Sequence, residues 1–286
     1  MSTPSEPVVA ERRHLINLAY RLLGSLAEAE DAVQETYARW YALTREQQEA
    51  VSSPGAWLTT VAGRICLDVL GSARVRRERY VGEWLPEPLP DQHDSVADRI
   101  TLDESVTMAF LVTLEAMTPA QRVALVLHDV FGYAFAEVAE ITGRTPAACR
   151  ELASSARRRV RDARPAAPAA RNADLVRDFK QAWEAGDIDA LVGLLDPAAT
   201  LTADGGGVVR AALLPVEGGE LVARYAADLA ATGVLTLVES TVNGEPGLLL
   251  RRGDELAAVW SFDVADGRIA RIWAIRNPEK LRSWLG

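Results

Sequence analysis

Two proline-containing breaks constrain the fold of this chain more than any other feature. Residues 82–95 include WLPEPLP and DQHD, and the three prolines favour an extended chain over a helix. Residues 162–172 include RPAAPAARN, which is rich in Ala and Pro and has no apolar periodicity. The chain has 286 residues, about twice the usual size of one domain. We therefore predict modules at 8–81, 96–161 and 173–286, joined by linkers at 82–95 and 162–172.

The first two modules have the periodicity of helices. Apolar residues recur at steps of three and four across residues 15–26 and 29–40. Ser-Pro at 53–54 and Thr-Pro at 118–119 and 145–146 each place a capping side chain before a first-turn proline, which is a typical helix start. We expect both modules to be entirely α-helical.

The third module has a different pattern. Helices are expected at 175–183, 188–195 and 220–231, and strands at 234–242, 247–251, 255–264 and 268–275. Asn243-Gly244 and Asp266-Gly267 separate apolar segments and are strong hairpin signals, whereas residues 204–207 form a Gly-rich turn. The pattern predicts an α+β domain with helices packed on a curved antiparallel sheet.

The composition excludes several protein classes. A charged fraction of 25% and a hydrophobic fraction of 49% are ordinary for globular proteins. No apolar run reaches the roughly 18 residues of a membrane span, and the first residues lack a secretion signal, so we expect a cytoplasmic protein without membrane contact. Cys66 and Cys149 are isolated from each other and from histidine, so neither a disulfide framework nor a metal site is expected, and no cofactor is implied.

The charge distribution points to nucleic acid although the net charge is -9. Residues 144–161 contain six arginines and one glutamate, and residues 64–79 contain five arginines and two acids. The first of these stretches lies in a helix-turn-helix pattern, where Gly143 permits the turn and Thr145 can cap the next helix. The front of that helix would enter a major groove with Thr145, Ala147, Ala148, Arg150 and Arg157, while Arg158, Arg159 and Arg161 would lie near phosphates. A helical hairpin with a solvated basic face is the alternative.

An acidic helix precedes the basic stretches. In SLAEAEDAVQETYARWY, residues 25–41, the apolar side chains form one stripe and leave Glu28, Asp31, Gln34, Glu35 and Arg39 on the other side. A solvated face explains this pattern in isolation. Because a basic helix follows within the same module, the pair indicates a protein that joins a basic protein partner to DNA.

These motifs resemble those of an extracytoplasmic-function sigma factor over the first 161 residues. DAVQE looks like the core-polymerase-binding segment of sigma region two, and SPGAWLTTVAGRICLDVL looks like the part that opens and reads the minus-10 element. The stretch from TPAQRV to ARRRV looks like region four, which reads the minus-35 element. The resemblance implies two partners, core RNA polymerase and promoter DNA.

The same resemblance implies site residues. The core-polymerase contacts would be Asp31, Gln34 and Glu35. The loop 44–53 and the helix 64–76 would hold the non-template strand at minus-10, with Arg64, Asp68, Arg74, Arg76 and Arg77 as contacts. The minus-35 contacts would be Arg144, Thr145, Ala147, Ala148, Arg150, Arg157 and Arg158.

The third module resembles a SnoaL-like domain of the nuclear-transport-factor-2-like superfamily, which a subgroup of these sigma factors carries. WLPEPL, DGGG and NPEKL support the resemblance, although the subgroup usually has Lys and Asp where this chain has Val208 and Glu279. In that subgroup the domain looks like a built-in regulator that replaces a separate anti-sigma protein.

A Trp-anchored, proline-stiffened segment is a good ligand for a groove, because little chain entropy is lost when it docks. We therefore hypothesise that WLPEPL packs against the third module and sets the relative position of the DNA-binding modules. The contacts would be Trp84, Leu85, Pro86, Glu87, Pro88, Asp204, Gly205, Gly206, Gly207, Asn277, Pro278, Glu279, Lys280 and Leu281. The alternative is that WLPEPL is a spacer, DGGG a turn and NPEKL a helix start.

Other functions remain to be weighed. SnoaL-like folds include enzymes, and Asp204 or Asp263 could serve as a base, but all three histidines precede this domain and exclude a His-Asp dyad. We expect no catalytic residue, and the alternative is a SnoaL-like domain that senses a small molecule or retains cyclase- or isomerase-type activity. A helix-turn-helix regulator that does not bind core polymerase is the second alternative.

Overall fold

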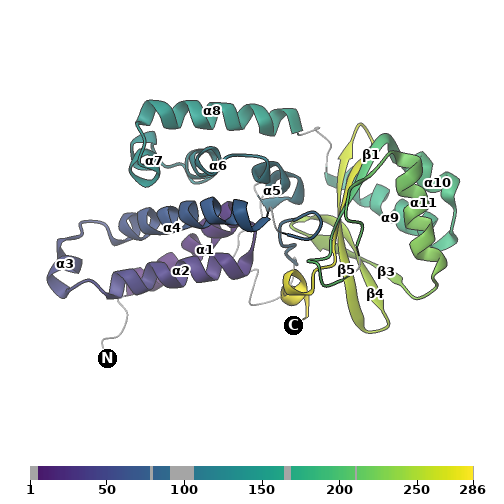
Figure 1. Cartoon of the computed structure of the whole chain (residues 1–286), viewed down its shortest axis with the longest axis horizontal. Helices are drawn as coiled ribbons and strands as arrows, with labels where there is room; N and C mark the ends of the chain where they lie inside the picture. Colours follow the sequence, from purple (N-terminus) through teal and green to yellow (C-terminus); the bar gives the residue numbers. More distant parts are fainter. Residues whose placement is uncertain (1–5, 78–79, 91–105, 164–168, 210, 286) are drawn as a thin grey trace. The chain divides into compact units, whose positions relative to one another are not determined.

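The chain forms two compact units (Figure 1). The computed structural model describes residues 6–77, 80–90, 106–163, 169–209 and 211–285, with the backbone alone at 6–10, 73–77 and 169–171. Of the described residues, the helical unit holds 6–77 and 113–162. The C-terminal unit holds 80–90, 106–112 and the rest of the chain from residue 163.

The helical unit contains α1 (Glu6–Leu23), α2 (Leu26–Tyr41), α3 (Arg45–Ala50) and α4 (Pro54–Arg77). After the end of α5 (Met108–Glu115) come α6 (Pro119–Leu125), the π-helix η2 (Val126–Val130), α7 (Phe135–Thr142) and α8 (Pro146–Ala163). The predicted helical character of both modules is confirmed. The expected loop 44–53 differs, because Thr44 and Gln47 form a capping box that starts α3.

The core of the helical unit joins its N-terminal and C-terminal helices. Leu15, Leu18 and Leu22 of α1 are fully buried, as is Leu58 of α4. On α4, a side chain at Gly63 would place its Cβ 2.8 Å from Ile141 Cγ2 of α7, so glycine permits close helix packing here.

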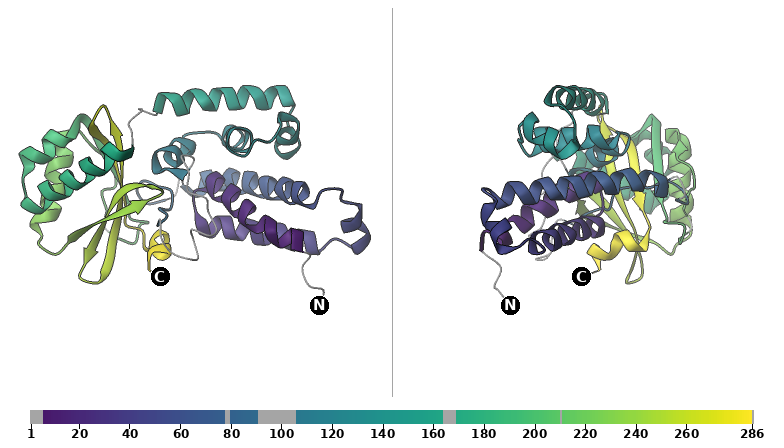
Figure 2. Two further views of the ribbon diagram at one scale, coloured as in Figure 1. Left: turned by 180° about the vertical axis from the view of Figure 1, so that it is seen from behind. Right: turned by 60° about the vertical axis from the view of Figure 1, so that its left-hand side comes forward.

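The C-terminal unit contains α9 (Ala169–Ala185), α10 (Ile188–Leu194), α11 (Gly219–Ala231) and the 3-10 helix η3 (Pro278–Trp284) around a sheet. Its strands are β1 (Leu195–Asp204), β2 (Val216–Glu217), β3 (Thr236–Val242), β4 (Glu245–Arg252), β5 (Glu255–Ala265) and β6 (Arg268–Ile275). The order in the sheet is β2-β1-β6-β5-β4-β3. Figure 2 shows α9 to α11 on one side of this sheet.

The sheet departs from the antiparallel expectation at one place. β1 pairs in parallel with β6, whereas the other neighbours are antiparallel. The sequence did not predict β1 because Pro197 lies within it and interrupts the strand pattern. The register between β1 and β6 shifts around this proline, between Leu195 and Thr200.

Both faces of the sheet are buried. Leu248, Leu250 and Trp260 pack in a cluster with Phe179 of α9 and other residues of the helical face. The alternate residues, such as Leu249, Val259 and Trp273, belong to a second cluster on the other face. We call this second group the linker cluster, because Leu85 of WLPEPL and Met108 of α5 complete it. Its buried members are Leu85, Met108, Val242, Leu249, Leu256, Val259, Trp273, Ile275 and Leu281.

Candidate functional site

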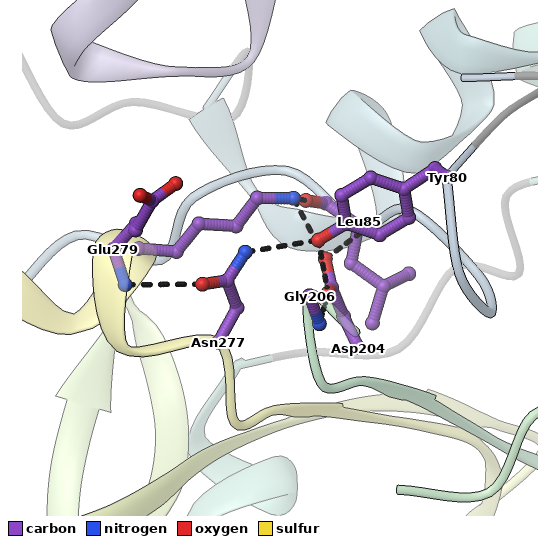
Figure 3. A network of polar contacts seen from close by, with 7 residues as sticks. Tyr80, Leu85, Asp204, Gly206, Asn277 and Glu279 are labelled. Carbon is purple, nitrogen blue, oxygen red and sulfur yellow. Dashed lines mark hydrogen bonds and ion pairs between the residues drawn. The ribbon is translucent and has the colours of Figure 1, made fainter. Parts of the chain in front are cut away.

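The fully buried carboxylate of Asp204, at the end of β1, accepts four hydrogen bonds (Figure 3). Its Oδ1 accepts from the Tyr80 hydroxyl at 2.6 Å and from the Gly206 N–H at 3.0 Å. Its Oδ2 accepts from the Leu85 N–H at 3.0 Å and from the Lys280 ammonium at 2.7 Å. Charged donors and backbone N–H groups together compensate for the loss of water around a buried charge. Residues of WLPEPL, DGGG and NPEKL thus meet at one carboxylate.

Lys280 holds the other side of the Leu85 peptide. Its Nζ donates to the Leu85 carbonyl as well as to Asp204, so both polar groups that flank the Leu85 side chain are occupied. The same Nζ lies 3.9 Å from the centroid of the Trp84 ring and 5.4 Å from that of Tyr80. Because the Lys280 side chain is only 9% exposed, water competes little with these contacts.

Asn277 connects this ion pair to η3. Its Nδ2 donates to the Tyr80 hydroxyl at 2.9 Å, and its Oδ1 accepts from the Glu279 N–H at 3.0 Å, which caps η3. Burial, followed by the hydrogen bond to Asp204, raises the pKa of Tyr80. The phenol therefore stays protonated and donates to the carboxylate.

The DGGG turn leaves room for this network. Gly206 has a φ of +65°, and a Cβ there would lie 2.6 Å from Asn277 Cγ, so a side chain would displace the cap. Val208, where the sigma-factor subgroup usually has Lys, is 76% exposed. Glu279 is also exposed, so both departures from the subgroup pattern leave the buried contacts in place.

The rest of the linker motif is also buried. Residues 85–90 are all buried, and the Pro88 carbonyl accepts from Trp284 Nε1 at 2.9 Å. Pro90 forms an antiparallel bridge with Val242 at the end of β3. The adjoining turn residue, Asn243, donates from its backbone N–H to the Leu89 carbonyl. The motif therefore docks along its length, well beyond the Asp204 network.

The helix-turn-helix has the expected local geometry. Gly143 ends α7 with a φ of +65°, and Thr145 Oγ1 accepts from the Ala148 N–H at the start of α8. The side chains of Arg144, Thr145, Ala147, Arg150 and Arg158 are exposed, and Ala148 is half-buried.

Two arginines of α8 contact residues that precede it. Arg150 lies 5.2 Å from the centroid of the Phe135 ring. Arg157 forms a two-point ion pair with Asp129 of η2 at 2.6 and 3.0 Å, and this hydrogen bonding raises its pKa. Arg157 would have to leave Asp129 before it could contact DNA with its full guanidinium.

The residues predicted to contact core polymerase lie on α2, and those predicted to contact the minus-10 element lie on α4. Asp31, Gln34 and Glu35 are exposed on α2, and Glu35 pairs with Arg39 one turn later. Arg64 and Asp68 are exposed on α4. Arg74, Arg76 and Arg77 belong to the backbone of α4, but their side chains lie outside the described residues.

Known proteins share this organisation. Family models match as Sigma-70 region 2 at residues 8–79 and Sigma-70, region 4 at residues 107–160. The chain is 40% identical to the ECF RNA polymerase sigma factor SigJ of Mycobacterium tuberculosis, over 95% of this chain and 91% of that protein. The chain belongs to the extracytoplasmic-function sigma factor family.

Two further comparisons cover nearly all of this sigma factor. It is 35% identical to the probable ECF RNA polymerase sigma factor SigI of the same species, over 97% of the chain and 95% of that protein. The crystal structure of M. tuberculosis SigJ matches it with a TM-score of 0.77 and 37% identity, covering 96% of each chain. The C-terminal unit is accordingly SnoaL-like, and the protein directs RNA polymerase to promoters. A helix-turn-helix regulator without polymerase would not explain the region-two match.

Regions two and four contact each other within the helical unit. The Tyr133 hydroxyl lies 2.8 Å from His14 Nε2 of α1 and 3.1 Å from Thr59 Oγ1 of α4. Arg122 of α6 is buried and donates to the Leu22 carbonyl of α1 at 2.9 Å, and burial lowers its pKa to about 9. Arg64 donates to the carbonyl of Glu140 in α7 at 2.9 Å.

The two candidate bases of the SnoaL-like unit are both engaged. Asp204 is occupied by its four donors, and Asp263 accepts from Arg271 Nε at 2.7 Å. A recess beside Trp260 and Arg276 has a volume of about 10 Å³, enough for about one water molecule. Within the described ranges, no group of three or more His, Cys, Asp or Glu side chains could hold a metal ion. In the same part of the chain, no helix is long and apolar enough to cross a membrane.

The sequence did not indicate several contact residues, among them Tyr80, Trp284 and Asn243. Tyr80 precedes WLPEPL, Trp284 follows NPEKL, and Asn243 was interpreted only as part of a hairpin turn. A signal for this docking does exist in the sequence. The LLL and VW runs of β4 and β5 put apolar side chains on both sheet faces, and such a sheet needs a cover on each side.

Proposed function

We propose that the SnoaL-like unit regulates this sigma factor in cis by holding the connecting segment, residues 80–106, between the two family matches. The observation that carries the proposal is the grip on Leu85, whose N–H is bound by Asp204 and whose carbonyl is bound by Lys280. The burial of Leu85 and Met108 in the linker cluster supports the same role near both ends of the segment. An attached regulator needs no separate anti-sigma protein, because tethering gives it a high effective concentration.

We further propose that the docked state restrains initiation. The minus-10 and minus-35 elements are about 25 base pairs apart, which is about 85 Å along B-DNA. Regions two and four instead contact each other through Tyr133, Arg122 and Arg64. Such direct contact cannot persist when each region binds its own element, so this arrangement has to open. A docked connecting segment opposes that opening.

The roles of individual residues follow from the family. In this proposal, core polymerase is bound by the exposed acidic face of α2, and DNA by α4 and the front of α8. The polymerase contacts are Asp31, Gln34 and Glu35, and the minus-10 contacts are Arg64, Asp68, Arg74, Arg76 and Arg77. The minus-35 contacts are Arg144, Thr145, Ala147, Ala148, Arg150 and Arg158, with Arg157 joining them once it leaves Asp129.

The proposal gives the SnoaL-like unit no catalytic role and no cofactor. The four donors on Asp204 support this, because a carboxylate whose lone pairs are taken is a poor base, and Asp263 is paired with Arg271. The protein would act where core polymerase acts, in the cytoplasm. Its specificity would reside in regions two and four, and its control in the connecting segment.

Run-off transcription with core polymerase tests the proposal, on promoters selected from a random library. Leu85→Ala in the full chain removes a side chain that is 3% exposed, and such a change costs about 2–5 kcal/mol, so it weakens docking. We expect initiation several-fold above that of the unmodified protein. Val81→Ala is the matched control, because Val81 lies in the same segment but is 56% exposed.

Binding to core polymerase, measured on the same samples, makes the result interpretable. If Leu85→Ala binds core and initiates less than the unmodified protein, the unit assists initiation and the proposed restraint is wrong. If all three proteins initiate equally, the docked segment has no regulatory effect. A stimulation shared by Val81→Ala would also count against the specific grip on Leu85.

A further inference from the structure

The side chain of Asn243 binds two parts of the connecting segment at once. Its Oδ1 accepts from the Leu89 N–H at 2.9 Å, and its Nδ2 donates to the Val106 carbonyl at 2.8 Å. The Asn243 backbone N–H adds a bond to the Leu89 carbonyl at 2.9 Å. Asn243 is fully buried, so these bonds face little competition from water.

A hairpin turn does not require this arrangement. Asn243 and Asp266 are the non-glycine residues with positive φ in the described part of the chain, at +54° and +50°. Each starts a turn that continues with glycine, and Asn and Asp both tolerate this conformation. Asp266 is exposed, as is usual for a turn, whereas Asn243 is buried beneath the connecting segment. The difference indicates that the Asn243 amide serves a purpose beyond the turn.

The two bonds bring distant positions of the chain together. Leu89 and Val106 are 17 positions apart in the sequence, and a fully extended chain of that length would span about 58 Å. In the structure, a backbone atom of each lies within 3 Å of the same amide group. While both bonds hold, these 17 positions therefore add almost nothing to the distance that the connecting segment can span between regions two and four.

We propose that Asn243 is a positioning residue that clamps the connecting segment and so sets the spacing between promoter elements that this sigma factor accepts. The inference rests on the proposed cis regulation and assigns it a second anchor, separate from the Asp204 network. With the clamp closed, the segment contributes little to the distance between regions two and four. Opening it frees a longer tether, which allows a broader range of distances.

Two variants of the full chain separate the two bonds. Asn243→Gly keeps the turn, since glycine readily adopts a φ near +54°, but removes both side-chain hydrogen bonds. Asn243→Asp keeps the oxygen that accepts from Leu89 and loses the donor to Val106. Asp266→Gly is the matched control, because it makes the same kind of change in an exposed turn of the same sheet.

Hydrogen exchange tests the clamp without any assumption about transcription. In Asn243→Gly, we expect the Leu89 amide to exchange about fivefold to tenfold faster, the value of one net hydrogen bond. In Asn243→Asp, this amide should stay protected while peptides covering 106–112 exchange faster. Amides of 248–264 should be unchanged in all variants, which reports that the sheet remains folded. If the Leu89 amide of Asn243→Gly exchanges as in Asp266→Gly, the clamp does not exist.

Transcription from promoters that differ only in spacer length tests the functional part. The unmodified protein and Asp266→Gly should share one narrow optimum, and Asn243→Gly should initiate over a wider range of lengths. A uniform change at every length would contradict a role in spacing, even with faster exchange at Leu89. The two failures are distinguishable. If Leu85→Ala leaves initiation unchanged, the proposed cis regulation is wrong. If Leu85→Ala raises initiation but Asn243→Gly leaves the spacer-length profile unchanged, only the Asn243 clamp is wrong.

Discussion

The helical unit and the SnoaL-like unit each bring together distant segments, but by different chemistry. Regions two and four share hydrogen bonds at partly exposed sites, such as Tyr133 with Thr59 and Arg64 with the Glu140 carbonyl, beside the close packing of α4 on α7. The connecting segment meets the SnoaL-like unit through a buried ion pair and an apolar cluster. Contacts of the first kind exchange readily for water, and those of the second do not. We therefore expect the partly exposed hydrogen bonds between regions two and four to break more readily than the buried contacts of the connecting segment.

Removing the central carboxylate should give the largest effect on this comparison. Asp204→Ala leaves the Lys280 charge buried without its partner, so we expect the free energy of unfolding to fall by about 3–5 kcal/mol. Chemical denaturation followed by tryptophan fluorescence measures it, with Asp254→Ala in an exposed turn as the control. Because an apolar pair can replace a buried ion pair, Asp204→Leu with Lys280→Met should recover part of the loss. A loss below 1 kcal/mol would show that the linker contact contributes no more to the free energy of unfolding than the contact between regions two and four.

Tyr80→Phe should have the next largest effect, since it removes a hydrogen bond to a charged acceptor. We expect a loss of about 1.5–3 kcal/mol at pH 8. The pKa of Tyr80 is raised in the folded protein, so above the ordinary value of about 10 the unfolded state loses this proton first. The stabilisation is therefore complete below pH 10 and declines as the pH rises further. The difference in free energy of unfolding between the unmodified protein and Tyr80→Phe should be smaller at pH 10.5 than at pH 8. An equal difference at both pH values would contradict a buried, hydrogen-bonded phenol.

Tyr133→Phe tests the other side of the comparison. It removes neutral hydrogen bonds to His14 and Thr59, so we expect a loss of only about 0.5–1.5 kcal/mol in the stability of the helical unit. Thermal unfolding measures the change, and Tyr41→Phe, at a position 54% exposed, is the matched control. A loss as large as that of Tyr80→Phe would show that regions two and four are held as firmly as the connecting segment.

Asp129→Ala should have the smallest effect on stability, below about 1 kcal/mol, because the Arg157 side chain is 42% exposed in the pair. Freeing Arg157 should instead strengthen binding to a minus-35 duplex. The plot of log affinity against log salt should steepen by about 0.9, the contribution of one added phosphate contact. Asp162→Ala controls for the general loss of negative charge, because Asp162 is an exposed acid on α8, the helix that carries Arg157. Weaker binding by Asp129→Ala would show that the pair positions α8.

The sequence predicted the helical character of the first two modules apart from α3, four of the six strands and the motifs that meet at Asp204. These features depend on local patterns such as proline starts, Asn-Gly turns and apolar periodicity. β1 was not predicted because Pro197 interrupts its strand pattern, and β2 was not predicted because it is only two residues long. The bonds of Asn243 to Leu89 and Val106 link positions more than a hundred residues apart, and no local pattern encodes such pairing. Its visible signal, Asn-Gly, is fully explained by the hairpin.

In the proposed cis regulation, release of the connecting segment would expose one face of the sheet. Once the connecting segment leaves, Leu249, Val259 and Trp273 lose the cover that Leu85 provides. An apolar patch that becomes exposed to water favours association with another apolar surface or renewed docking of the segment. Under the proposed cis regulation, we therefore expect the signal that releases the segment to bind that face or to act together with a partner that does.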